Sequence, residues 1–142
     1  MPSGSQTAPA STVMLWVGRV ISALLIVLML FDGGIKILKL PAAVEGTVRL
    51  GYPASTVQLI GIIALVCALL YAIPRTSILG AILLTGYLGG ATATQVRVQD
   101  AWSIFPPILG ALIWAGVYLR DERLRALIPL NLRKQKVLNQ AK

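Results

Sequence analysis

The residues of this sequence that could do chemistry are a few polar and charged side chains within or beside long apolar segments. Guanidinium and ammonium groups can hold an anionic headgroup, a quinone oxygen or another carbonyl, and hydroxyl, amide and carboxylate groups can complete such a site. Ionisable residues at membrane depth are costly, which makes them candidates for function. The candidate ligand- or partner-binding residues are Arg19, Asp32, Lys36, Thr92, Gln95 and Arg97.

Catalytic and metal chemistry has few suitable residues here. The chain has no histidine, which removes the commonest metal ligand and the usual acid–base group at neutral pH. Its one cysteine, Cys67, allows neither an intrachain disulfide nor a CxxC redox pair. We therefore expect no catalytic residue, no metal site and no encoded cofactor, and a protein that is not an enzyme. Binding of a quinone or a lipid remains compatible with these residues.

The elements that position these residues are four apolar segments. Hydrophobic residues make up 56% of the chain and charged residues 13%, and the mean hydropathy is +0.78, outside the range of ordinary soluble domains. Each segment is near the roughly 20 residues that a helix needs to span a bilayer, and each is continuous rather than alternating, which excludes membrane β-strands. The sequence predicts an all-α, polytopic bundle of four transmembrane helices. The segments are 13–31, 57–73, 77–96 and 102–119.

The remaining chain is too short for a second domain. We expect a short tail at 1–12, one transmembrane domain at 13–130 and a basic tail at 131–142. The first apolar segment is not expected to be a cleaved signal peptide, because no Lys or Arg precedes it and no A-x-A site follows it. The outer loop at 32–56 is apolar enough to be partly membrane-associated, with Lys36 and Lys39 on its wetter face.

Charge placement predicts the orientation. Seven cations follow the last segment and share a side with Arg75, which makes eight, whereas the opposite side holds four: Lys36, Lys39, Arg49 and Arg97. We expect the protein in the inner membrane of a bacterial cell. The positive-inside rule then predicts that both termini lie on the cytoplasmic side. A basic tail beside a membrane span binds anionic lipid, so the charge of +8 does not predict a nucleic-acid partner. The seven cations are Arg120, Arg123, Arg125, Arg133, Lys134, Lys136 and Lys142.

Arg19 has two interpretations. It lies six residues past Val13, about 10 Å from the inner end of its helix, so its side chain could reach that surface by snorkelling. Alternatively, it faces the bundle interior and holds a ligand, since no Asp or Glu inside a span can pair with it.

At the outer mouth of the bundle, antiparallel packing brings the ends of several segments together. Asp32 and Arg97 are expected to form an ion pair there, either as a structural salt bridge or as part of a small polar pocket. Thr92 and Gln95 lie on the same helix end as Arg97. Tyr87, in the middle of its segment, is not expected to have a special role.

Small residues recur every four positions in the third segment. Such a stripe lets helix backbones approach closely in a membrane, so we expect it to pack inside the bundle; lining a pocket or pairing two chains are the alternatives. The expected packing residues are Gly86, Gly89, Gly90 and Ala93.

Six motifs follow one another along the chain: WVGR at 16–19, FDGGIK at 31–36, VEGTVRLGYP at 44–53, LYAIPRT at 70–76, LGAILLTGYLGG at 79–90 and YLRDERLR at 118–125. Together, over about residues 16–130, they closely resemble the DoxX-like family of small bacterial four-helix membrane proteins. The resemblance implies a fold and a membrane, and relatives in the wider group that serve as membrane subunits of quinone-linked sulfur oxidation or as partners in redox-stress complexes. Family members often have His where this chain has Gln95, so a role that needs an imidazole is in doubt.

Three functions are compatible with these features. The resemblance and the lack of redox groups favour an accessory or assembly subunit, possibly redox-linked, with a membrane or periplasmic protein partner or a second copy of the chain. The alternative is a binder of a lipid-soluble molecule such as a quinone, through Arg19 or the Arg97 mouth. A small exporter ranks last, because Asp32 lies at the end rather than the centre of a span.

Overall fold

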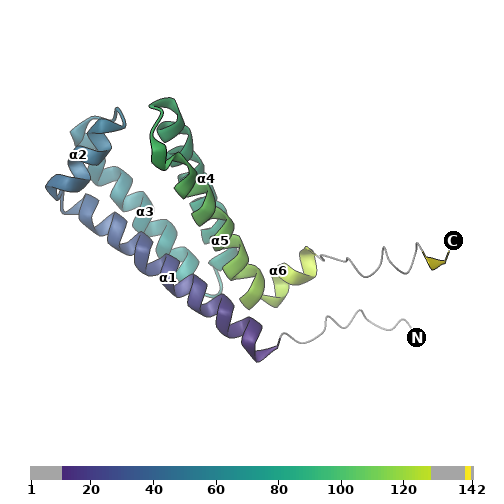
Figure 1. Ribbon diagram of the computed structural model, residues 1–142. Coiled ribbons are helices and arrows are strands. Elements are labelled where there is room, and N and C mark those ends of the chain that lie inside the picture. The colour runs from purple at the N-terminus through teal and green to yellow at the C-terminus, as the bar shows by residue number, and fades with distance from the viewer. Residues whose placement is uncertain (1–10, 129–139, 142) are drawn as a thin grey trace.

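The computed structural model describes residues 11–128 and 140–141, and this part of the chain is helical without strands (Figure 1). Four of its segments are long and apolar enough to cross a membrane, which confirms the predicted fold class: Thr12–Ile37, Ala54–Ala72, Ser77–Arg97 and Ala101–Arg120. The elements in order are α1 (Thr12–Ile37), α2 (Pro41–Arg49), the 3-10 turn η1 (Ala54–Thr56), α3 (Val57–Ala72), α4 (Ser77–Arg97), the 3-10 turn η2 (Ala101–Ile104), α5 (Phe105–Arg120) and α6 (Glu122–Leu127).

Local sequence explains where these helices begin and end. The Ser11 hydroxyl accepts the Met14 N–H at 3.2 Å and caps α1, and Pro41 occupies the first turn of α2, where its missing N–H is harmless. Pro74 follows α3 closely and helps to end it, while the Asp100 carboxylate caps η2 by accepting the Trp102 N–H at 3.0 Å. The predicted tails, 1–12 and 131–142, lie almost entirely outside the described residues, as do the cations Arg133, Lys134, Lys136 and Lys142.

The first helix is longer than the sequence predicts. We expected the outer loop to start at Asp32, but α1 continues to Ile37 and therefore contains both Asp32 and Lys36. The reason is that Gly33 is a helix contact and not a turn: a Cβ atom at Gly33 would lie 2.9 Å from the Gly61 carbonyl oxygen of α3. The rest of the loop forms α2, which rests on the bundle through its buried residues Ala43 and Thr47.

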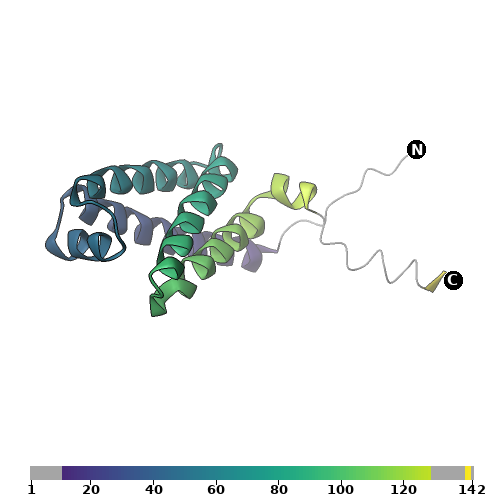
Figure 2. The same ribbon diagram turned by 90° about the horizontal axis from the view of Figure 1, so that it is seen from above.

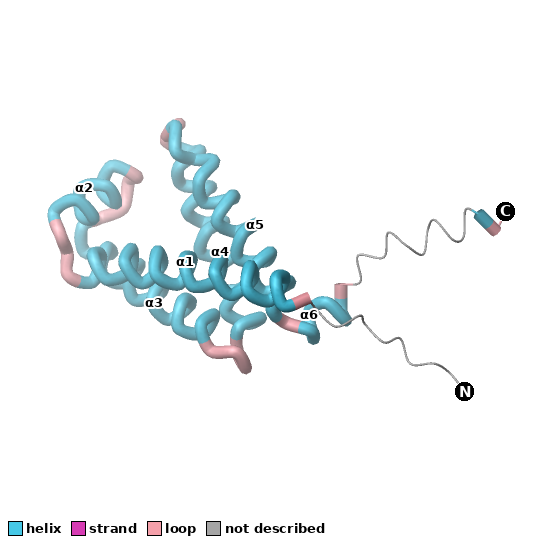
Figure 3. Tube along the Cα trace, turned by 60° about the horizontal axis from the view of Figure 1, so that its bottom comes forward, coloured by secondary structure: helices cyan, strands magenta, loops and turns pink. Residues whose placement is uncertain are grey.

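The four long helices form a V. Helix α1 packs against α3 and α5, and α4 packs against the same two helices. One arm of the V is α1 with α3 and the other is α4 with α5; the arms meet near α6 and separate towards α2 (Figures 1 and 2). We call these the α6 end and the α2 end. The tube in Figure 3 shows the same divergence, with α2 at the open end of the first arm.

Tight contacts hold the α6 end closed. Tyr71 is fully buried there, and its hydroxyl donates to the Ile113 carbonyl at 2.9 Å and lies 3.1 Å from the Ser22 hydroxyl. This bond network joins α1, α3 and α5 through one aromatic side chain, and Gly116 leaves room for it, since a Cβ there would lie 3.0 Å from the Tyr71 hydroxyl. Towards the α2 end, α1 and α3 stay in contact through Gly33 and Gly61, whereas polar side chains connect α1 to α4.

Candidate functional site: a polar cleft between α1 and α4

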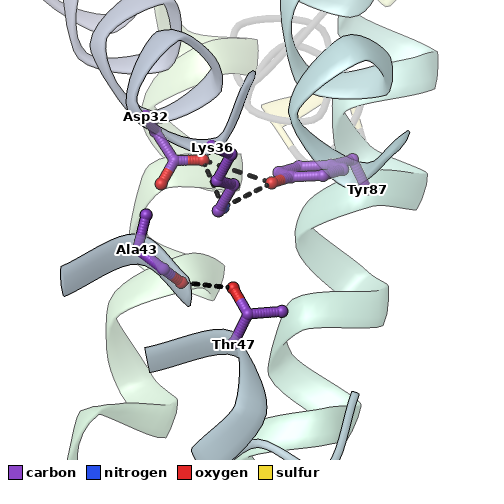
Figure 4. A network of polar contacts seen from close by, with 5 residues as sticks. All are labelled: Asp32, Lys36, Ala43, Thr47 and Tyr87. Carbon is purple, nitrogen blue, oxygen red and sulfur yellow. Dashed lines mark hydrogen bonds and ion pairs between the residues drawn. The ribbon is translucent and has the colours of Figure 1, made fainter. Parts of the chain in front are cut away.

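Three polar side chains join the two arms where the V is open (Figure 4). The Lys36 Nζ atom lies 2.6 Å from the Asp32 carboxylate and donates to the Tyr87 hydroxyl oxygen at 3.1 Å. The Tyr87 hydroxyl in turn donates to the same Asp32 oxygen at 3.2 Å, which closes a triangle of hydrogen bonds. The side chains of Lys36 and Asp32 are only 16% and 32% exposed. We call Asp32, Lys36 and Tyr87 the polar triad.

The secondary structure explains why these residues meet. Asp32 and Lys36 are four residues apart near the end of α1, so they lie one above the other on one face of the helix. Tyr87 is the midpoint of α4, and its long ring reaches from the second arm towards α1. The Lys36 Nζ atom also lies 5.8 Å from the centre of that ring, within the range of a cation–π contact.

A cavity of about 280 Å³ lies beside the triad, between α3 and α4 and under α2. Its polar groups are Lys36 and Tyr87 together with the Tyr52 and Thr94 hydroxyls, which lie 3.0 Å apart. Its walls are apolar and come largely from α3 and from small residues of α4. The lining residues are Lys36, Thr47, Leu50, Tyr52, Ile60, Ile63, Gly86, Tyr87, Gly90, Ala91 and Thr94.

A second cavity, of about 460 Å³, shares Lys36 with the first and is more strongly charged. Asp32, Arg49 and Asp100 line it, and so does Gln95. The Gln95 Oε1 atom is buried and accepts no hydrogen bond from the described residues. A buried acceptor without a donor is unfavourable, which marks Gln95 as a polar group of this cavity that the described residues do not satisfy. Lys36 therefore lines both cavities, together with Tyr87 in the first and with Gln95 in the second.

The predicted Asp32–Arg97 ion pair is wrong. Asp32 pairs with Lys36 because α1 continues far enough to place an ammonium group one turn away. Arg97 is exposed and donates to the Leu50 carbonyl at 2.9 Å, at the C-terminal end of α2, where unpaired carbonyls attract a cation. Lys36 was expected on the wetter face of a loop and is instead mostly buried in the cleft.

The other predicted site residues are spread over the molecule. Thr92 donates its hydroxyl to the Leu88 carbonyl of its own helix and lines a groove between α4 and α5 rather than the cleft. Arg19 lies at the α6 end, beside Arg120 and Pro74. The structure thus brings together Asp32, Lys36 and Gln95 and leaves the remaining three apart.

Two residues of the candidate site were not predicted from the sequence. Tyr87 was expected to have no special role, yet it completes the triad, and Thr47 lines both cavities from a helix that was predicted as loop. The signal for Tyr87 was its hydroxyl in the middle of an apolar span, because a buried tyrosine hydroxyl usually finds a partner.

The glycine stripe does not pack inside the bundle, contrary to the prediction. A Cβ atom added at Gly86, Gly89 or Gly90 would meet no atom within 4 Å. Gly86 and Gly90 line the cavity beside Tyr87, and Gly89 and Ala93 line the groove between α4 and α5. The close helix contacts are made by other glycines, namely Gly18, Gly33, Gly61, Gly80 and Gly116. One alternative prediction for this stripe was that it lines a pocket, and Gly86 and Gly90 do so.

The cleft can bind a molecule that has a polar head and an apolar body. An ammonium group has three N–H donors, and Lys36 uses two of them on Asp32 and Tyr87, so one is left for an acceptor. The Tyr87 hydroxyl can turn from Asp32 to the same ligand atom. The apolar side chains of Ile60 and Ile63 lie in the same cavity and suit a hydrocarbon substituent.

Comparison with known proteins shows the family of the chain. No curated protein and no solved structure matches the chain significantly. The model of the DoxX-like family matches residues 20–117, a stretch that contains the whole polar triad and most of the four long helices. The chain is therefore a multi-pass membrane protein of the DoxX-like family.

Proposed function

We propose that this protein binds a lipid-soluble molecule with a hydrogen-bonding head, such as a quinone, in the cleft beside the polar triad. The observation that supports this proposal is the placement of Lys36 and Tyr87 at the head of a cavity whose walls are apolar. Ligand sites have this composition, with few polar groups that fix orientation and many apolar contacts that supply affinity.

The energetic cost of the triad favours a role in binding. Tyr87 is at the midpoint of α4, whereas Asp32 and Lys36 lie in the last two turns of α1, so the triad joins the end of one span to the middle of another. A buried ion pair seldom stabilises a protein more than apolar residues of the same size, and charges at membrane depth usually mark a functional pathway or site. If the Asp32–Lys36 pair served only to hold α1 and α4 together, apolar residues would do this at a lower cost in free energy.

The route to the cleft also suits a lipid-soluble ligand. Ile63, which lines the cavity, is 44% exposed on α3, and this helix faces lipid with other large apolar side chains such as Leu59 and Ile62. A ligand dissolved in the bilayer could enter between α3 and α4 without crossing water. Its head would then meet Lys36, and its tail would lie along α3.

Replacing Tyr87 with phenylalanine is expected to weaken binding of a short-chain quinone about five- to tenfold, because one hydrogen bond to the head is lost. The apparent dissociation constant is measured by titrating the quinone into nanodiscs that contain the protein. Tyr118→Phe, a matched change on α5 outside both cavities, should leave the constant unchanged. Equal binding by wild type and Tyr87→Phe would contradict a role for this hydroxyl.

A role as an accessory subunit is the second candidate, and the open glycine face of α4 favours it. Gly86, Gly89 and Gly90 have free space where a side chain would be, and small residues in this spacing receive helices in membranes. We propose both termini on the cytoplasmic side of the inner membrane, by charge placement, so that α2 would face a periplasmic partner. Gentle extraction followed by native mass spectrometry should then give a particle that contains a second protein; a lone chain or homo-oligomer would argue against this role.

A further inference from the structure

A small cavity at the α6 end is lined by cations and is separate from the cleft. Its volume is about 180 Å³, and its lining comes from α1, from the turn between α3 and α4, and from the end of α5. Arg19 and Arg120 are its two cations and Asp121 its one anion, and Pro74 and Ser77 complete it. It shares no residue with the cavities beside the polar triad.

Arg120 is held in position with part of its hydrogen-bonding capacity unused. One Nη atom donates to the Tyr71 carbonyl at 3.0 Å, and the guanidinium lies 5.0 Å from the centre of the Tyr71 ring. Its Nε atom is buried and donates to no acceptor among the described residues. Among the described residues the Tyr71 carbonyl is the one acceptor that the five N–H donors of Arg120 find, so this fixed guanidinium can donate to an acceptor that enters the cavity from outside the chain.

Arg19 faces the same cavity from α1. It makes no hydrogen bond or ion pair within residues 11–128, and its side chain is exposed. Arg19 lies at the level of the α3–α4 turn and the end of α5, so it is not deep within the bundle. Trp16, one turn earlier and 60% exposed, is a residue typical of the membrane–water interface.

The remaining groups of the cavity leave a net positive charge. The Asp121 carboxylate already accepts the Arg123 N–H at 2.9 Å, where it caps α6. The Thr76 hydroxyl donates to the Leu70 carbonyl, so it does not cap the start of α4, and Ser77 donates to the Pro74 carbonyl. The positive end of the α4 dipole therefore adds to the two guanidinium groups.

We propose that Arg19 and Arg120 bind a phosphate group in this cavity. Guanidinium groups bind phosphate oxygens bidentately, and basic pockets between helices at the surface of a membrane suit lipid headgroups. The phosphate can belong to a phospholipid or to a soluble compound, because both present the same oxygens at this level. The site does not depend on the ligand of the cleft, which lies towards the other end of the bundle.

Arg19→Gln tests this site, because Arg19 makes no bond that folding needs. In native mass spectrometry of the full chain from nanodiscs, retention of phosphatidylglycerol over phosphatidylcholine is expected to fall about tenfold in this variant. Arg75→Gln, which removes a cation from the same end but outside the cavity, should retain the lipid as wild type does. If the protein binds inorganic phosphate instead of lipid, and Arg19→Gln weakens this binding, the natural ligand is a soluble phosphate compound and the proposed site is supported.

A gain-of-binding variant gives a second, independent readout. Asp121→Asn keeps the cap of α6 but removes the one anion of the cavity, so phosphate or lipid retention should rise about threefold. Glu122→Gln is the matched control: the Glu122 side chain is 76% exposed and lies outside the cavity, so this change should not alter retention. Retention that responds equally to Arg19→Gln and Arg75→Gln, for both lipid and phosphate, would overturn the proposal.

Discussion

Gly80→Ala is expected to lower the free energy of unfolding by about 3 kcal/mol, the upper range for overpacking a tight contact. A Cβ atom at Gly80 would overlap the backbone nitrogen and Cα of Tyr71 and lie 2.7 Å from the Leu70 carbonyl carbon. These are backbone atoms of α3, so no side-chain rotation can relieve the overlap and the two helices must separate. The measurement is the midpoint of denaturant-induced unfolding in detergent micelles.

The matched control is the same substitution six residues later on the same helix. Gly86→Ala should be neutral or stabilising by up to about 1 kcal/mol, because alanine is the better helix former and nothing lies within 4 Å of the new methyl group. If Gly86→Ala lowered the free energy of unfolding as much as Gly80→Ala does, the glycine stripe would be packed against another chain in the assembled protein.

Lys36→Met is expected to abolish ligand binding in the cleft and to cost about 2–3 kcal/mol of stability, because the substitution leaves the Asp32 carboxylate mostly buried without its cation. This cost is smaller than the roughly 3–5 kcal/mol of a fully buried pair, since Asp32 retains some contact with solvent. Thermal unfolding and quinone titration in nanodiscs measure the two effects. Lys39→Met, at an exposed lysine beyond the end of α1, should change neither.

A double substitution separates binding from stability. Lys36→Met with Asp32→Asn removes both charges, so stability should return to near that of wild type, whereas binding should stay lost because the ammonium donor is gone. If binding returned along with stability, the triad would be a structural link between the arms, and the ligand head would have to be held by other groups.

The fold was predictable because continuous apolar segments near the length of a membrane span have few other stable structures in a bilayer. The helix boundaries in the first loop were not predictable. The Gly33-Gly34 pair is typical of a turn, but in the structure it lies inside α1, where Gly33 packs closely against Gly61 of α3. Helix α2 has a weakly apolar sequence of nine residues, and its position depends on the chain around it.

The candidate site was predictable only in part. Asp32 and Lys36 stood out as charges beside a span, but the partner of Asp32 depends on how far α1 continues, so Arg97 was assigned in its place. Tyr87 and the glycine stripe depend on how far the arms diverge, which no local pattern encodes. Arg19 had two interpretations, snorkelling or facing the bundle interior, because the sequence does not show which residues of other helices lie beside it; it is exposed and lies beside Pro74 and Arg120.

The most direct test of the cleft is to locate where a ligand binds. A photoreactive short-chain quinone is cross-linked to the protein in nanodiscs, and the labelled peptides are identified by mass spectrometry. We expect labels on the cavity-lining residues of α1, α2 and α4, near Lys36, Thr47 and Tyr87, and we expect excess unlabelled quinone to remove them. Labels spread over lipid-facing side chains such as Leu24 and Val27, unaffected by competitor, would contradict binding in the cleft.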